Sequence, residues 1–277
     1  MPVTLFMEDV TVLDYAYFDA ATGARGDTLV VDVELGGELD ANGFVFDFGK
    51  AKRAIKGAID RDIDHRAVVP RRAAGLVIEQ TRDRVHVRYG GVDYSAPDSA
   101  LAFIDAVTIT RESIAAHIEH LVRPHMPANV RTIDVHLHPD ARAQLAPSFC
   151  YTHGLRAHDG NCQRLLHGHC GTFHTTWDGK ADTELAQWLA RRFDGAHFAA
   201  QRDVRGSLVA YVAEQGAFDL VMPHGRVVAI DAEPSIENLT RIAFETVVNE
   251  RHLDGNRLVV SAYEGSRKGA CFSVLQA

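Results

Sequence analysis

The 277-residue chain has only four cysteines, no CxxC pair among them, and no apolar run near the roughly 20 residues that a membrane-spanning helix needs. It also lacks an excess of basic residues, because 29 lysines and arginines stand against 37 acidic residues, a net charge of −8. These features argue against a zinc ribbon, a membrane protein and a protein that binds nucleic acid or anionic membranes non-specifically. The first residues show no basic segment followed by an apolar one, so we expect no signal peptide and a cytoplasmic location.

What is present is ordinary globular composition, with 46% hydrophobic and 24% charged residues, in a chain long enough for two domains. Cys150, Cys162 and Cys170 lie close together in the sequence. Since a cytoplasmic protein keeps its thiols reduced, we interpret all four cysteines as thiols, and Cys150 and Cys170 as core residues.

Alternating apolar and polar residues predict strands over residues 5–18 and 28–35. Apolar residues at helical spacing predict a helix over 49–60, and Thr110 is a good N-cap for a second helix over 112–122. A strand is expected at 132–138.

The second half of this pattern repeats 125 residues later, because 110–114 aligns with 235–239 and the strand at 132–138 aligns with 257–263. A repeat of this length indicates domain duplication rather than a solenoid. We therefore predict an α+β fold with two units, residues 1–140 and 141–277, each built on an antiparallel sheet.

Fifteen histidines are an unusual number for this length, and several surround the clustered cysteines. His167 and His169 are two residues apart on a predicted strand and would point to the same face, where His153 on the preceding strand could join them. Three histidines without a fourth protein ligand are typical of a catalytic zinc site, which keeps one position open.

Further motifs are divided between the halves. The second half has F-x-x-x-H at 149–153, Cys162, H-G-H at 167–169, P-S-I-E-N-L at 234–239 and Tyr263-Glu264, and the first half has F-D-F at 46–48 and Ile63-Asp64-His65. Together they resemble the 6-pyruvoyl-tetrahydropterin synthase and 6-carboxy-tetrahydropterin synthase family of the tunnelling fold. The resemblance implies two tandem tunnelling-fold units, each a four-stranded antiparallel sheet with a helix pair on one face.

The resemblance also implies the roles of the site residues. His153, His167 and His169 would bind Zn²⁺, Cys162 would take a proton from the substrate, Asp64 and His65 would form a proton relay, and Glu264 would bind the pterin ring. The first unit lacks the metal motif but has the Asp-His pair, so composite sites are expected, formed within one chain or between two. The sequence leaves that choice open, as it does the choice among Arg156, Arg164, Arg267 and Lys268 for binding a triphosphate.

The leading hypothesis is a zinc-dependent lyase of tetrahydropterin or queuosine biosynthesis that acts on 7,8-dihydroneopterin triphosphate or a close analogue. The resemblance further implies a homo-oligomer. The pyruvoyl, carboxy and aldolase-type reactions all remain open. The alternatives are a pterin- or purine-binding protein without catalysis, and an assembly scaffold stabilised by metal.

Overall fold

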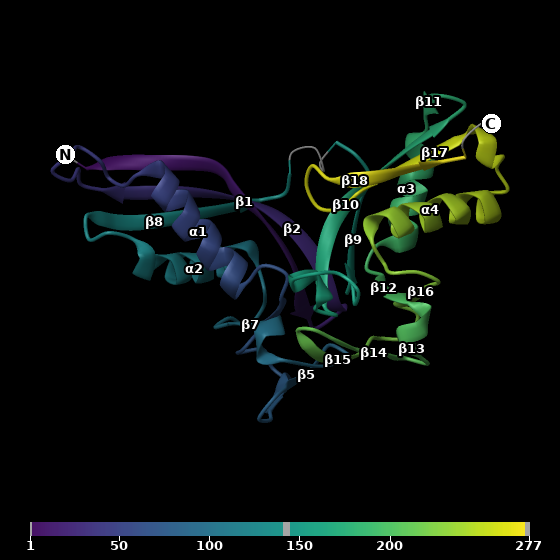
Figure 1. Cartoon of the computed structure of the whole chain (residues 1–277), viewed down its shortest axis with the longest axis horizontal. Helices are drawn as coiled ribbons and strands as arrows, with labels where there is room; N and C mark the ends of the chain where they lie inside the picture. The colour runs from purple at the N-terminus through teal and green to yellow at the C-terminus, as the bar shows by residue number, and fades with distance from the viewer. Residues whose placement is uncertain (1, 141–144, 275–277) are drawn as a thin grey trace.

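A computed structural model describes residues 2–140 and 145–274 of the chain. The first half is built on a five-stranded sheet of order β7-β3-β1-β2-β8. Its strands are β1 (Val3–Asp19), β2 (Gly23–Gly37), β3 (Ala67–Pro70), β7 (Leu101–Ile104) and β8 (Val130–His138). Helices α1 (Phe48–Asp62) and α2 (Arg111–Val122) lie against this sheet and close its core (Figure 1).

The second half is built on a seven-stranded sheet whose main path is β16-β12-β9-β10-β17-β18, with β11 paired to β10. Its strands are β9 (Ser148–His153), β10 (His167–Trp177), β11 (Lys180–Ala181), β12 (His197–Ala200), β16 (Val227–Ile230), β17 (Leu258–Tyr263) and β18 (Gly269–Ser273). Helices α3 (Thr183–Phe193) and α4 (Ile236–Arg251) pack against it. The order β16-β12-β9-β10-β17 repeats the order of the first sheet, strand for strand.

The predicted α+β class is confirmed, but the prediction of four antiparallel strands in each sheet is wrong. The structure has five and seven strands, and β3 and β12 pair in parallel with their neighbours on both sides. Both of these short strands follow a helix, and a crossover through a helix brings a strand back in the parallel direction. The division of the chain at residue 140 stays a prediction.

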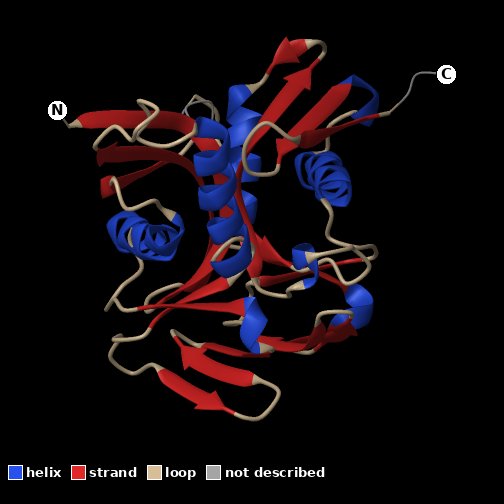
Figure 2. Ribbon diagram, turned by 60° about the vertical axis from the view of Figure 1, so that its left-hand side comes forward, coloured by secondary structure: helices blue, strands red, loops and turns tan. Residues whose placement is uncertain are grey.

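A third sheet takes strands from both halves, in the order β13-β14-β15-β6-β5-β4. This sheet lies at the bottom of the molecule in Figure 1 and in Figure 2. Its strands are β4 (Val77–Gln80), β5 (Val85–Tyr89), β6 (Val92–Ala96), β13 (Val204–Arg205), β14 (Leu208–Ala213) and β15 (Gly216–Val221). The halves meet where β6 pairs with β15, and one hydrophobic cluster contains Phe18 and Tyr94 together with Leu166 and Phe218. The two halves therefore share both a sheet and a core.

The predicted helices are confirmed within one or two residues at each end. Helix α1 buries Ala51, Ile55, Ala58 and Ile59 on one face, as the spacing of these residues requires. Helix α2 begins after Thr110, whose side chain accepts a hydrogen bond from the Ser113 amide in a capping box. Among the described residues, no helix is long and apolar enough to cross a bilayer.

Candidate active site

The three predicted metal ligands converge. Antiparallel pairing of β9 with β10 sets His153 directly opposite His167, and His169 follows two residues later on the same face. One ligand atom from each of the three residues lies within 4.8 Å of the others. All three residues are buried, at 1% exposure or less.

Hydrogen bonds at Nδ1 orient two of the three imidazoles, and the third has a carboxylate beside its Nδ1 atom. His153 Nδ1 lies 2.7 Å from the Pro234 carbonyl, His167 Nδ1 lies 2.7 Å from the Arg164 carbonyl, and His169 Nδ1 lies 3.1 Å from Asp14 Oδ1. Acceptors at Nδ1 fix the tautomer that leaves Nε2 as an electron-pair donor, which is how proteins orient metal-binding histidines. Within residues 2–140 and 145–274, three ring nitrogens of this cluster are buried without a hydrogen-bond partner, namely Nε2 of His153, Nε2 of His167 and Nδ1 of His169.

The electrostatics of the cluster also suit a cation. Burial, reinforced by the neighbouring His169, lowers the pKa of His153 to about 3, and burial places the pKa of His167 well below its ordinary value. Both rings are therefore neutral at physiological pH, the form that binds metal. Two orphaned Nε2 atoms, a third imidazole and the nearby carboxylates of Asp14 and Glu264 make a donor set that fits Zn²⁺.

Asp64 and His65 lie beside this cluster in the same chain. The His65 ring centroid is 5.2 Å from that of His167 and 5.9 Å from that of His169. His65, Cys162 and His167 also form a group whose ligand atoms lie within 4.8 Å of one another. The first half thus brings an acidic–imidazole pair to the histidines of the second half without a partner chain.

The pair is held rigidly. His65 Nδ1 lies 2.6 Å from Asp64 Oδ2, while Asp64 Oδ1 accepts a hydrogen bond from the Asp14 amide at 3.0 Å. The His65 amide donates to the Asp14 carbonyl at 2.7 Å, and its backbone adopts the left-handed conformation with φ of 54°. Burial disfavours the charged imidazole, but the hydrogen bonds to Asp64 and Cys162 outweigh it and raise the pKa of His65 to about 10.

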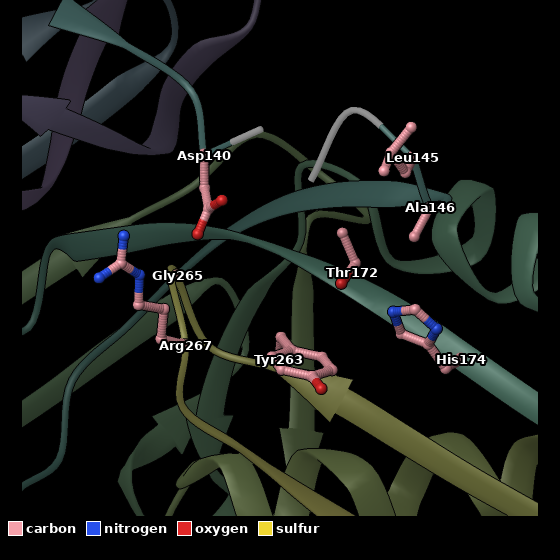
Figure 3. Close-up of a pocket in the computed structure, with 8 residues that line it drawn as sticks. All are labelled: Asp140, Leu145, Ala146, Thr172, His174, Tyr263, Gly265 and Arg267. Atoms are coloured by element: carbon pink, nitrogen blue, oxygen red, sulfur yellow. The ribbon is translucent and has the colours of Figure 1, made fainter. Parts of the chain in front are cut away.

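Glu264 follows β17 and faces the histidines. Its Oε1 atom lies 3.7 Å from His169 Nε2 and 4.0 Å from His153 Nε2, and its Oε2 atom lies 3.3 Å from Lys268 Nζ. Burial opposes ionisation of this carboxyl group, but the two histidines and Lys268 lower its pKa. The preceding Tyr263 instead lines a separate cavity of about 260 Å³ with His174 and Arg267 (Figure 3). None of the seven predicted site residues lines that cavity.

The interpretation of Cys150 and Cys170 as thiols is wrong, because they form a disulfide in the structure. They face each other across β9 and β10 with a Cα–Cα distance of 4.0 Å, and both are half-buried rather than in the core. Cys162 and Cys271 are free. The two cysteines meet because of the register between β9 and β10, and their positions in the sequence do not indicate that register.

In the second half, Asp194 and Gly195 make the backbone contacts that Asp64 and His65 (the Asp64–His65 corner) make in the first half, but glycine has no imidazole. Asp194 Oδ1 accepts from the Cys150 amide at 2.9 Å, and the Gly195 amide donates to the Cys150 carbonyl at 2.6 Å. These bonds repeat those that Asp64 and His65 make to Asp14. Gly195 stands where His65 stands, with φ of 73°, and a Cβ there would lie 2.4 Å from Arg226 Nη2.

Comparisons with known proteins point to one family. A sequence model of 6-pyruvoyl tetrahydropterin synthase matches residues 23–147. A protein of Pyrococcus horikoshii, provisionally named 6-carboxy-5,6,7,8-tetrahydropterin synthase, is 24% identical over 137 residues, which cover 50% of this chain and 82% of the relative. Its counterpart in Pyrococcus abyssi, named in the same way, is 28% identical and covers 47% of this chain and 78% of the relative.

Solved structures that match part of the chain include 6-pyruvoyl tetrahydropterin synthase from Plasmodium vivax, with a TM-score of 0.42 and 20% identity over 50% of this chain and 91% of that one. The Plasmodium falciparum enzyme has a TM-score of 0.42 and 18% identity over 49% of this chain and 90% of that one. The family match ends at residue 147, so the histidines of β9 and β10 are assigned from geometry.

Proposed function

Since the chain belongs to the 6-pyruvoyl tetrahydropterin synthase family, whose members are pterin lyases, we propose that it is a zinc-dependent lyase acting on 7,8-dihydroneopterin triphosphate or a close analogue. The observation that carries the proposal is the convergence of His65 and Cys162 with three buried histidines within one chain. A site with a metal centre, a thiol and an imidazole held by a carboxylate has the groups needed to move protons at a carbon next to an oxygen.

His153, His167 and His169 would hold the zinc ion, which when bound polarises the oxygen atoms of the substrate side chain. Glu264 would anchor the pterin, because a carboxylate accepts two parallel hydrogen bonds from the 2-amino and N3–H edge of such a ring. Its position beside the histidines would keep the side chain of the substrate near them.

Cys162 would take the proton from the carbon of the substrate side chain. His65 would return a proton, since its raised pKa keeps the ring protonated at neutral pH, and Asp64 would keep that ring in place through the bond at Nδ1. Among the basic candidates for the triphosphate, Arg156 is bonded to Asp203, Arg267 to Asp9 and Lys268 to Glu264.

The test combines metal analysis of protein purified without chelators with incubation of the zinc-loaded protein with dihydroneopterin triphosphate. Product mass then distinguishes the pyruvoyl, carboxy and aldolase-type reactions. Protein without zinc, or zinc-loaded protein without turnover, contradicts the proposal. If the wild-type protein and a Cys162→Ala variant bind the pterin equally and neither turns it over, the protein is a pterin-binding protein instead.

A metal-stabilised scaffold is separated from an enzyme by gradual removal of zinc. A structural metal would unfold the second half as it leaves, whereas a catalytic metal would cost activity before structure.

A further inference from the structure

The turn that carries Cys162 is held by a hairpin of the third sheet. This turn (Asn161–Gln163) lies against the tip between β14 and β15, where Gln215 Nε2 donates to Asn161 Oδ1 at 3.0 Å and the Gln215 amide donates to Gln163 Oε1 at 3.0 Å. The Tyr211 hydroxyl donates to the Gln163 carbonyl at 2.7 Å. The hairpin thus holds the turn at both residues that flank Cys162.

The residue after this turn, Arg164, crosses from the hairpin to the Asp64–His65 corner. Its Nε atom donates to Gln215 Oε1 at 3.1 Å, and Nη1 reaches the carbonyl oxygens of Asp64 at 3.3 Å and His65 at 3.4 Å. Its side chain comes from the second half, 100 residues away in sequence from Asp64 in the first. It connects the cysteine turn to the backbone that carries the imidazole.

Arg164 is also linked to the metal ligands. Its own carbonyl oxygen accepts the hydrogen bond from His167 Nδ1 at 2.7 Å, which fixes that imidazole. Arg164 therefore contacts one predicted metal ligand through its backbone and the proton relay through its side chain, two residues after the predicted catalytic cysteine.

The environment of Arg164 is unusual for a charged group. Only 6% of the residue is exposed. Among the described residues it makes no ion pair within 4.0 Å, and its guanidinium donates instead to a side-chain amide oxygen and two backbone carbonyl oxygens. Burying a guanidinium without a carboxylate is costly, so simple stabilisation does not account for an arginine at this position. A role in holding triphosphate fits poorly as well, because Nε and Nη1 already point into the protein.

We propose that Arg164, locked in place by Gln215, is a positioning residue that sets the Cys162 turn against the Asp64–His65 corner. The guanidinium suits this task because its donors point in fixed directions and can bridge carbonyl groups on separate elements. Lysine, with one flexible ammonium group, cannot reproduce the bridge. The part concerning turnover rests on the proposed function, and the part concerning position does not.

The variant that tests the bridge is Arg164→Met, with Arg84→Met as its control. Arg84 is a half-buried arginine just before β5 whose side chain contacts the Ser95 carbonyl and Asp219 and none of the predicted site residues. In zinc-loaded protein, Arg164→Met should lower kcat by about 10²-fold, because displacement of a catalytic group by an ångström costs about that much. KM and zinc content should stay within about twofold of the wild type. Arg84→Met should leave kcat unchanged.

Hydrogen exchange supplies a readout that does not depend on turnover. The amides of Leu155, bonded to the Cys162 carbonyl, and His65, bonded to the Asp14 carbonyl, should exchange faster by about tenfold in Arg164→Met. Amides of β14 should be unaffected. Gln215→Ala should accelerate exchange at Leu155 more than at His65, because it frees the cysteine turn first.

These outcomes separate the two proposals. Unchanged kcat in an active enzyme, or exchange that rises equally in β14, would overturn the positioning role, since uniform acceleration means only general destabilisation. If the wild-type protein shows no turnover, the proposed function fails, and the exchange pattern alone decides whether Arg164 joins the two segments.

Discussion

The strongest prediction is that a single chain supplies all the residues of one active site. His65 and Cys162 come from different halves, yet both lie beside His167 in a single chain. His65→Ala and Cys162→Ala should each lower kcat by 10²- to 10⁴-fold, the usual contribution of a general acid or base. Because every site would take both groups from its own chain, mixing the two variants should restore nothing.

The activity expected if the site forms between two chains can be calculated. If His65 served the histidines of a neighbouring chain, an equal mixture would pair an intact His65 with an intact Cys162 at one half times one half of the sites. A quarter of the wild-type activity per site would then return.

The assay is co-expression of the two variants with different affinity tags, isolation of the doubly tagged assembly, and measurement of turnover per zinc ion. Two wild-type chains carrying the two tags serve as the control for assembly. Isolation of doubly tagged assemblies removes those made of one variant alone, so sites formed between chains would return a half of the wild-type activity per site in a dimer, falling toward a quarter in larger rings. Recovery in that range would refute the assignment of the site to one chain, and recovery near zero in a doubly tagged assembly would support it. If the protein is a monomer, no doubly tagged species forms, and exchange between chains is excluded directly.

Three further predictions concern stability and metal binding. Burial lowers the pKa of His197 to about 3, below its value of about 6.5 when unfolded, so the metal-free protein should lose stability as pH falls below 6.5. From pH 7 to pH 5 this group should lower the unfolding free energy, measured with urea, by about 2 kcal/mol, and His197→Gln should reduce the pH dependence by that amount. Reduction with a dithiol should lower the unfolding free energy by about 3 kcal/mol, with no effect on a Cys150→Ser/Cys170→Ser variant, whereas a count of four thiols before reduction would contradict the disulfide. Asp14→Asn should weaken zinc binding ten- to a hundredfold in competition with a chelating dye, and Asp32→Asn, which alters a surface pair with His138, should not.

Much of the local structure could be predicted because its causes are local. The spacing of Ala51, Ile55 and Ile59 predicts the buried face of α1, and the capping side chain of Thr110 predicts where α2 begins. The two histidines of β10 share a face because strand residues alternate, and this much needs no tertiary information.

The sheets were predicted less well because their edges depend on distant pairing. Strands β3, β7, β12 and β16 have four residues each, too few to show an alternating pattern. The third sheet depends on β6 meeting β15, a contact between the halves that no short window of sequence contains. The disulfide could not be predicted for the same reason, because Cys150 and Cys170 meet only through the register of β9 with β10, which the expected cellular compartment does not indicate.

Among the described residues, the first half does not repeat the three-histidine cluster of the second half, and the strand pairing shows which residues stand in its place. Matching Asp14 to Cys150 through their equivalent bonds to Asp64 and Asp194 aligns β1 with β9, and the paired residues then align β2 with β10. In this alignment Tyr17, Arg25 and Asp27 of the first half stand at the positions of His153, His167 and His169.

Arg25 is the decisive difference at the equivalent place. Its guanidinium forms an ion pair with Asp194 at 3.1 Å, so a fixed cation stands where a metal would need a neutral donor. Gly195 removes the imidazole from the same corner, and Arg226 fills the space that it would need. An aspartate stands at the equivalent place in both halves, where it accepts a hydrogen bond from a strand amide. An aspartate at this place is therefore common to both halves and does not by itself indicate a catalytic site. His65 and Cys162 distinguish the place where we propose that the reaction occurs.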